Sequence, residues 1–237
     1  MYKNKSFIGI IPARSGSVGL PHKNIRMFAG KPLMAWTILA ALESGVLDEV
    51  FVSTDSEQYA AIAKTYGANA PFLRPDDLSG DASPASGYIL HAIHEYRERF
   101  DKNFDYFVLL QPTTPLRTSE HIRDGVKMAV DDGLDSVVSF SRFDTDMRLI
   151  GELPPDLNLA AFSSRNSPND TLRQSASQLY CLNGMLYISK CDAYALTKSF
   201  YNSNGRAMII DDEYSIDIDN EIDFSVAEFL SKKEKAV

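Results

Sequence analysis

The sequence has 237 residues, of which 44% are hydrophobic and 24% charged, so it fits one globular domain or a domain with an appendage. Its formal net charge is −8. This balance excludes a general nucleic-acid binder, because neutralising a phosphate backbone needs a broad basic surface. A small anionic substrate is compatible with it, since a local basic pocket can form on an acidic protein.

Cysteine usage and the apolar runs bear on the compartment. Cys181 and Cys191 form no C-x-x-C motif, so the sequence suggests neither a zinc site nor a disulfide framework. The stretch SFIGIIPA at 6–13 is too short for the core of a signal peptide. The run LMAWTILAAL at 33–42 is well short of the roughly 20 residues that cross a bilayer. We therefore expect a cytoplasmic protein without a membrane partner.

Short apolar runs alternate with helical patterns over the first 140 residues. Strands are predicted where β-branched and aromatic residues gather, at 7–11, 49–53, 106–110 and 136–140. Helices are predicted between them, with Ser or Pro at several starts and Gly at several ends, at 32–45, 56–68, 86–100 and 119–133. This alternation predicts a three-layer α/β sandwich around a parallel sheet.

The pattern breaks at residue 141. From 141 to 178 the chain is polar and rich in Pro, Ser and Asn, and an irregular stretch of this length is usually functional or part of an interface. A further strand is predicted at 184–189 and a closing amphipathic helix at 220–233. We expect residues 1–140 and 179–237 to form the α/β domain, with 141–178 as an insertion.

A glycine-containing loop, IIPARSGSVGLPHKN at 10–24, follows the first predicted strand at the edge where α/β sheets bind ligands. It matches neither G-x-G-x-x-G nor G-x-x-x-x-G-K-[ST]. Gly16 and Gly19 nevertheless allow backbone amides to turn toward an anion. Arg14 can form paired bonds to phosphate oxygens, and Lys23 supplies a point charge.

The charge around this loop favours a phosphate site over the alternative, a turn with solvated basic residues. Residues 1–42 contain six Lys or Arg and no Asp or Glu, although the whole chain is acidic.

The acidic segment DDEYSIDIDNEID at 211–223 holds seven carboxylates in thirteen residues. Asp217 and Asp219 alternate with Ile216 and Ile218, and strand periodicity would place both carboxylates on one face. Two carboxylates suit magnesium held against a polyphosphate. The alternative is a solvated acidic strand end. A basic loop and a carboxylate pair together predict a nucleotide site.

These motifs make the chain resemble the CMP-sialic acid synthetases, also called acylneuraminate cytidylyltransferases. The family loop reads approximately I-P-A-R-x-G-S-K-G-L-P-x-K-N, and here it is IPARSGSVGLPHKN. Further similarities follow in the family's order: VSTDS at 52–56, LRPDDLSGD at 73–81, LLQPTTPLR at 109–117, LNGMLYIS at 182–189 and SIDID at 215–219. They run from residue 8 to about 224.

The resemblance implies a Rossmann-like domain that joins CTP to a nine-carbon α-keto acid sugar, releasing pyrophosphate with the help of Mg²⁺. Its implied catalytic residues are Arg14 and Lys23 at the triphosphate and Asp217 and Asp219 at the metal. The implied nucleotide-binding set is Ala13, Arg14, Ser15, Gly16, Ser17, Lys23, Asn24, Arg74 and Asp81.

For the sugar, the resemblance implies contacts with Gln111, Pro112, Thr113 and Arg117. Tyr187, near the Asn-Gly pair at 183–184, is a further candidate, and packing is the alternative role. An extension such as 141–178 would form a homodimer and reach into the partner's site. Arg148 and Arg173 are the candidates to meet the sugar carboxylate there.

Departures from the family pattern concern both halves of the site. Val18 replaces a lysine often found in the loop, His22 stands where a basic residue often precedes Lys-Asn, and Cys181 and Leu182 stand where some relatives carry Arg-Pro. These changes leave open whether the sugar is N-acetylneuraminic, legionaminic, pseudaminic or a related acid. No general base is evident in the sequence.

Three rival functions use the same features. The substrate could be an eight-carbon octulosonic acid, although LPHKN and SIDID fit the sialate branch better. A nucleotide-sugar glycosyltransferase would use Asp217-x-Asp219 as a D-x-D motif, but that motif usually lies mid-chain. A catalytically silent nucleotide-binding domain is disfavoured by the intact Arg14, Lys23, Asp217 and Asp219. Pyrophosphate release separates a cytidylyltransferase from the last two rivals, because a glycosyltransferase releases a nucleoside mono- or diphosphate and a silent domain releases nothing.

Overall fold

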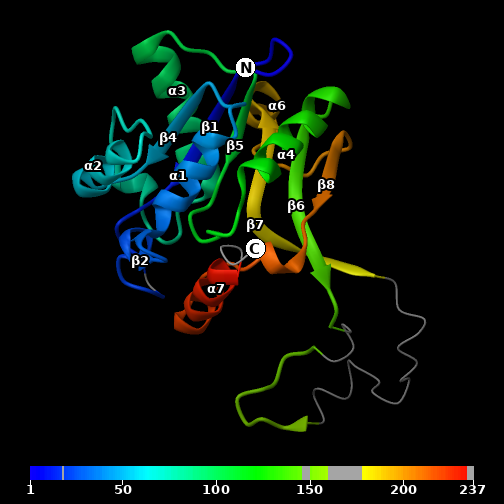
Figure 1. The fold of residues 1–237 in the computed structure, drawn as a ribbon. Helices are drawn as coiled ribbons and strands as arrows, with labels where there is room; N and C mark the ends of the chain where they lie inside the picture. Colours follow the sequence, from blue (N-terminus) through cyan, green and yellow to red (C-terminus); the bar gives the residue numbers. More distant parts are fainter. Residues whose placement is uncertain (18, 146–149, 160–177, 234–237) are drawn as a thin grey trace.

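The computed structural model describes residues 1–17, 19–145, 150–159 and 178–233 (Figure 1). These residues form an α/β sandwich around a six-stranded sheet with the order β4-β1-β5-β7-β6-β8. The strands are β1 (Phe7–Pro12), β4 (Glu49–Ser53), β5 (Tyr106–Leu109), β6 (Ser136–Phe143), β7 (Leu179–Lys190) and β8 (Gly205–Ile209). β1 pairs in parallel with β4 and β5, β6 pairs in parallel with β8, and β7 runs antiparallel to both of its neighbours. The predicted mainly parallel sheet is therefore confirmed.

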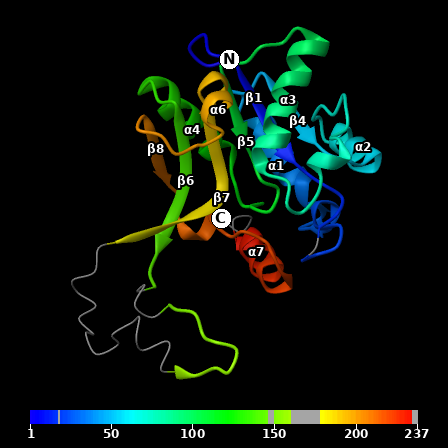
Figure 2. The same cartoon turned by 180° about the vertical axis from the view of Figure 1, so that it is seen from behind.

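Helices cover both faces of the sheet (Figures 1 and 2). One apolar cluster joins alternate strand residues to α1 (Leu33–Glu43), α2 (Glu57–Thr65) and α4 (Ser119–Asp131). A second cluster joins the other strand face to α3 (Ala85–Phe100) and α6 (Cys191–Thr197). The three-layer, Rossmann-like prediction is confirmed by this arrangement.

A third apolar cluster connects the two ends of the chain. The last helix, α7 (Glu221–Lys233), packs on the short hairpin β2 (Met27–Phe28) and β3 (Lys31–Pro32). The rings of Phe28 and Phe224 meet edge to face at 5.5 Å between their centroids. This packing places the segment before α7 beside the loop after β1.

Some elements differ from the sequence-based expectation. α6, β8 and the β2–β3 hairpin were not predicted, because each is short and weakly patterned. β6 continues to Phe143, so the first residues of the expected extension at 141–178 belong to a strand. β7 begins at Leu179, earlier than the strand predicted at 184–189. Within the described residues, no helix is long and apolar enough to cross a membrane.

Candidate functional site

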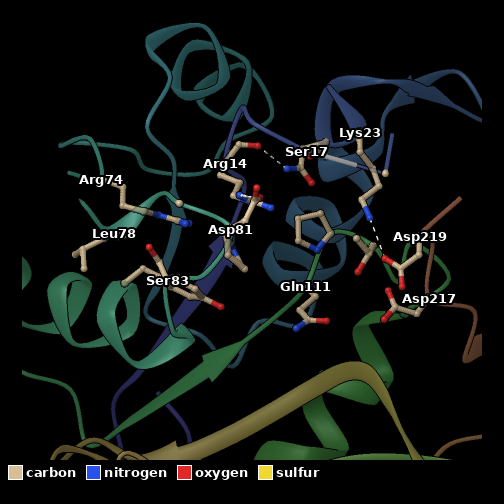
Figure 3. Close-up of a pocket in the computed structure, with 17 residues that line it drawn as sticks. Arg14, Ser17, Lys23, Arg74, Leu78, Asp81, Ser83, Gln111, Asp217 and Asp219 are labelled. Atoms are coloured by element: carbon tan, nitrogen blue, oxygen red, sulfur yellow. Dashed lines mark hydrogen bonds and ion pairs between the residues drawn. The ribbon is translucent and has the colours of Figure 1, made fainter. Parts of the chain in front are cut away.

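A cavity of about 780 Å³ opens at the carboxyl ends of β1 and β5 (Figure 3). This volume lies in the range of small-molecule sites. Arg14, Asp81 and Arg74 lie on one side of it, Lys23, Asp217 and Asp219 on the other, and Gln111 between them. The predicted site residues that line the cavity are Arg14, Ser17, Lys23, Asn24, Arg74, Asp81, Gln111, Pro112, Thr113, Asp217 and Asp219.

The loop after β1 is fixed by hydrogen bonds from its own residues. Asn24 is buried, and its side-chain amide donates to the carbonyl oxygen of Arg14 at 3.0 Å, which closes the loop on itself. The backbone N–H and the hydroxyl of Ser15 both donate to the carboxylate of Asp55, each at 2.8 Å. These bonds orient Arg14, Ser15 and Asn24 relative to one another without a ligand.

Gly19 brings this loop against the acidic segment. A Cβ atom at Gly19 would lie 2.7 Å from the backbone carbonyl oxygen of Asp219, which no side chain could tolerate without a backbone shift. Glycine is therefore required here for a close approach of two backbones.

The cations of the loop are paired with carboxylates of the same cavity. Arg14 forms an ion pair with Asp81. The ammonium nitrogen of Lys23 lies 3.2 Å from Asp219 Oδ1 and donates to the carbonyl oxygen of Ile218 at 2.6 Å. Each pair includes a carboxylate that is largely exposed, so both pairs are weak and open to exchange with a stronger anion.

The acidic segment does not form the predicted strand, and that prediction was wrong. Residues 215–219 follow the short helical turn η5 (Asp212–Tyr214) as an irregular stretch. The backbone N–H of Ile218 donates to the carbonyl oxygen of Thr113 at 2.8 Å, and the Ile218 side chain is fully buried. The alternation of isoleucine and aspartate therefore reflects which side chains are buried. It does not indicate pairing with a neighbouring strand.

A capping box then begins α7 and orients the end of the segment. Asn220 Oδ1 accepts from the N–H of Asp223, while the Asp223 carboxylate accepts from the N–H of Asn220 and of Asp219. Two consecutive backbone amides are thus held by one carboxylate. This turn fixes the backbone of Asp219 and so sets the direction of its side chain.

Asp217 and Asp219 are suited to a divalent cation. The protein atoms around the Asp217 carboxylate raise its pKa, the neighbouring charge of Asp219 adds to the effect, and a hydrogen bond with Thr113 opposes it. A bound cation would offset both unfavourable contributions. Magnesium typically uses one or two carboxylates together with water and substrate phosphate, which this pair can supply. Among the described residues, no group of three or more His, Cys, Asp or Glu gathers as a metal site.

Arg74 is a buried cation at the cavity wall. Its guanidinium donates to the hydroxyl and carbonyl oxygens of Ser53, at 3.0 and 2.7 Å, and lies 4.5 Å from the ring centroid of Tyr88. Burial lowers its pKa and raises that of Tyr88 to about 12. Tyr88 also lines the cavity, and sequence reasoning missed it because an aromatic residue in a helix is no signal of a site.

The backbone of Gly184 lies close to the side chains of Gln111 and Asp217. Its backbone has φ +72°, and a Cβ atom there would lie 2.7 Å from Gln111 Oε1 and 3.1 Å from Asp217 Oδ2. Any side chain at this position would enter the space between the two residues. Sequence reasoning noted the Asn-Gly pair but did not identify the glycine as part of the site.

Arg117 requires a correction, because it does not line the cavity. It is 4% exposed and donates to the backbone oxygens of Met185 and Gln111 and to the hydroxyls of Thr37 and Thr114. Burial lowers its pKa to about 9, which still leaves it protonated at neutral pH. With its donors used inside the protein, Arg117 supports the loop that carries Gln111 instead of facing a ligand.

Other predicted residues also lie outside the cavity lining. Ala13 is buried at the end of β1, Ser15 is turned toward Asp55, and Gly16 is exposed. Tyr187 lies on β7 and packs against Phe200, and burial raises its pKa to about 12. Arg148 and Arg173 lie outside the described residues.

Comparison with known proteins gives concordant matches. A family model described as Cytidylyltransferase matches residues 8–236. The N-acylneuraminate cytidylyltransferase of Escherichia coli O18:K1:H7 is 40% identical over 227 residues, which cover 95% of this chain and 52% of that protein. The CMP-N,N'-diacetyllegionaminic acid synthase of Legionella pneumophila is 38% identical over 231 residues, covering 94% of this chain and 95% of that protein.

The relatives differ in length and the solved structures are more distant. This chain spans about half the length of the Escherichia coli protein but nearly all of the Legionella protein. The structure of CMP:2-keto-3-deoxy-manno-octonic acid synthetase complexed with CTP superposes with a TM-score of 0.71 and 16% identity, covering 97% of this chain and 99% of that one. At this identity the likeness is one of fold.

Proposed function

Since the chain belongs to the cytidylyltransferase family, we propose that it joins CTP to a nonulosonic acid, giving the CMP-sugar and pyrophosphate. The observation that carries this proposal is the meeting of Arg14 and Lys23 with Asp217 and Asp219 in one cavity of about 780 Å³. A cationic loop and a carboxylate pair facing one space are what a nucleoside triphosphate with its metal requires. N-acetylneuraminic acid is the first sugar to test.

In the proposed reaction, the anomeric hydroxyl oxygen of the sugar bonds to the α-phosphorus of CTP. The bond from that phosphorus to the bridging oxygen of the β-phosphate breaks, pyrophosphate leaves, and the hydroxyl proton is released. Arg14 and Lys23 would exchange their carboxylate partners for phosphate oxygens and stabilise the charge that develops on pyrophosphate. Arg74, Asn24 and Asp81 would position the nucleoside, and Gln111 to Thr113 would face the sugar.

Asp217 and Asp219 would hold a magnesium ion, which when bound would offset phosphate charge and favour ionisation of the attacking hydroxyl. Thr113 and the capping box at Asn220 keep the two carboxylates at the cavity. Ser17 would contribute its hydroxyl to the phosphates, since its backbone N–H donates to the carbonyl oxygen of Ser15. The fixed loop reduces the reorganisation needed when CTP binds.

We further propose a homodimer and a cytoplasmic location. Phe140 shares a register position with both Leu182 and Ile209, so the three side chains point to the same sheet face, and the latter two are about half exposed. Exposed apolar residues gathered on one face are typical of an interface between subunits. Both cysteines are free thiols, which fits a reducing compartment. Sedimentation velocity on the wild type and on Leu182→Asp tests the dimer.

Pyrophosphate release tests the proposed activity. The protein is mixed with Mg²⁺, with CTP or UTP, and with N-acetylneuraminic, legionaminic, pseudaminic or octulosonic acid, each alone. We expect release with CTP and one nine-carbon acid, its loss in Asp219→Asn, and its loss on chelation of the metal. Asp212→Asn is the control, because this exposed carboxylate does not line the cavity. No release with any pair, or release of a nucleoside diphosphate instead, would contradict the proposal.

A further inference from the structure

Two side chains that do not line the cavity contact the phosphate loop from behind. Both belong to the segment that follows β4, where Asp55 precedes α2 and Tyr59 lies in its first turn. The hydroxyl of Ser56 caps this helix by accepting from the N–H of Tyr59 at 3.4 Å. The N–H of Ala13 donates to the carbonyl oxygen of Ser53 at 2.9 Å, which anchors the start of the loop to β4. The segment is therefore a stable support.

Asp55 holds the first part of the loop. One of its carboxylate oxygens accepts from the backbone N–H of Ser15 and the other from the Ser15 hydroxyl, both at 2.8 Å. Two bonds to one residue fix its orientation as well as its position, and bonds to a charged acceptor are stronger than neutral ones. The peptide plane that follows Arg14 is set by this contact.

Tyr59 holds the other end of the loop. His22 has φ 52° and ψ 30°, a left-handed conformation that is uncommon for a residue with a side chain. Its Nδ1 atom lies 3.2 Å from the hydroxyl oxygen of Tyr59, which is only 1% exposed. Burial raises the pKa of Tyr59, so its hydroxyl stays neutral and shares one hydrogen bond with the imidazole nitrogen. His22 directly precedes Lys23, and its backbone conformation sets where Lys23 begins.

We propose that Asp55 and Tyr59 are positioning residues that hold the two ends of the loop from Ser15 to His22 in the geometry that binds CTP. This inference rests on the proposed function. Neither residue lines the cavity, so each acts through the loop residue that it contacts. The charge of Asp55 argues for a geometric role, because a carboxylate behind a phosphate site weakens anion binding by its field alone.

The sign of this charge effect gives a sharp test. If Asp55 acted only through its field, Asp55→Ala and Asp55→Asn would strengthen CTP binding. If it positions the loop, Asp55→Ala weakens binding by about 10- to 100-fold, the loss expected for hydrogen bonds to a charged group. Asp55→Asn rescues part of this loss, since its amide can still accept from one Ser15 donor and donate to the hydroxyl oxygen. Titration calorimetry with CTP and Mg²⁺ measures these dissociation constants.

The Tyr59 contact is tested from both of its sides. Tyr59→Phe removes one hydroxyl, and His22→Asn removes the imidazole while keeping a residue that tolerates the left-handed conformation. Each should weaken CTP binding by about three- to tenfold, and the double variant should weaken it little further, because both remove the same bond. The Michaelis constant for the sugar should stay unchanged in all of them.

Matched controls separate this role from general stability. Tyr66→Phe removes a hydroxyl from the other end of α2. Asp48→Asn changes a carboxylate that accepts from the N–H of Phe7 at the opposite end of β1. Both should leave CTP binding unchanged, even where the free energy of unfolding falls.

Amide hydrogen exchange of the peptide 13–24 supplies a readout that needs no nucleotide. Exchange should be faster in Asp55→Ala and Tyr59→Phe than in the wild type and the controls. Unchanged exchange and unchanged affinity, or tighter CTP binding by Asp55→Ala, would overturn the inference. A wild type that binds no CTP would overturn the proposed function, and exchange would then still report whether these contacts anchor the loop.

Discussion

The ammonium nitrogen of Lys23 lies 3.2 Å from a carboxylate oxygen of Asp219, across 196 positions of the sequence. This pair joins the loop after β1 to the segment before α7. The same ammonium group donates to the carbonyl oxygen of Ile218 at 2.6 Å, so Lys23 holds two consecutive residues of that segment on its side of the cavity. Because Asp219 is mostly exposed, water competes for the ion pair, and its contribution to stability is small. A polyphosphate with its metal can therefore replace the pair at little cost.

This exchange predicts the effect of removing the lysine charge. Lys23→Met should weaken CTP binding by at least about tenfold, because a charge-assisted bond to phosphate is lost. It should change the free energy of unfolding by less than about 1 kcal/mol. Calorimetric titration with CTP and urea unfolding measure the two quantities. Lys64→Met, which removes an exposed charge from α2, is the control for net charge, and equal effects of the two variants on CTP binding would contradict the assignment.

Alanine substitutions at Gly184 and Gly133 separate the effect of backbone strain from the effect of a methyl group that obstructs the cavity. Gly184→Ala places a methyl group 2.7 Å from Gln111 Oε1 in a backbone with φ +72°, whereas Gly133→Ala meets the same strain, at φ +67°, in open space. Both should lose about 1 kcal/mol of stability from the left-handed backbone. Only Gly184→Ala should also lose turnover, since Gln111 and Asp217 must move apart. Thermal unfolding and pyrophosphate release test this, and equal activity in the two variants would remove Gly184 from the site.

The sequence predicted the layers and the main site because both depend on local patterns. Apolar periodicity identified β1, β4, β5 and most helices, and the loop with Arg14 and Lys23 follows directly from the end of β1. The same reasoning failed at 215–219, where buried and exposed residues alternate as they do in a strand. The backbone there makes a single hydrogen bond to Thr113 before the cap of a helix. Alternation shows which side chains are buried and does not show that a partner strand exists.

Arg117 shows a second limit of sequence reasoning. From the sequence, an arginine that follows Thr-Pro-Leu in a loop at the site is expected to contact the ligand. The orientation of its side chain is instead decided by acceptors such as the Met185 carbonyl oxygen, 68 positions away. Gly184 and Asp55 were missed for the same reason. Their importance comes from what the fold brings against them, Gln111 in one case and Ser15 in the other.

The buried position of Arg117 predicts a structural defect on substitution. Arg117→Lys keeps the charge but cannot reach the acceptors on Met185, Thr37 and Gln111 together, so it should lose about 3 kcal/mol in unfolding free energy. Arg97→Lys on the exposed face of α3 should change it by under about 0.5 kcal/mol. Urea unfolding compares the two. If Arg117→Lys were fully stable and raised the Michaelis constant for the sugar, the structural role would be contradicted. Arg117 would then be a direct ligand of the sugar, as the sequence suggested.

The raised pKa of Asp217 predicts opposite effects on stability and activity. Surrounding protein raises this pKa above the ordinary value of 3.8, and the charge of Asp219 adds to it. Between 3.8 and the raised value, the folded protein binds more protons than the unfolded chain, so its unfolding free energy falls as pH rises through that window. In the absence of metal, Asp217→Asn should therefore be more stable than the wild type at pH 7, and the difference should shrink toward pH 4.

Activity should respond in the other direction, because a cation needs the ionised carboxylate. Asp217→Asn should lose at least about 100-fold in pyrophosphate release, and the acidic limb of the wild-type profile should lie above pH 3.8. Urea unfolding in chelator from pH 4 to 8 measures the stability difference, with Asp212→Asn as the exposed control. A difference independent of pH would show that the pKa of Asp217 is not shifted by folding. A variant less stable than the wild type at pH 7 would show that the surroundings of Asp217 stabilise its ionised form. The fold would then gain from the carboxylate that the proposed function assigns to the metal.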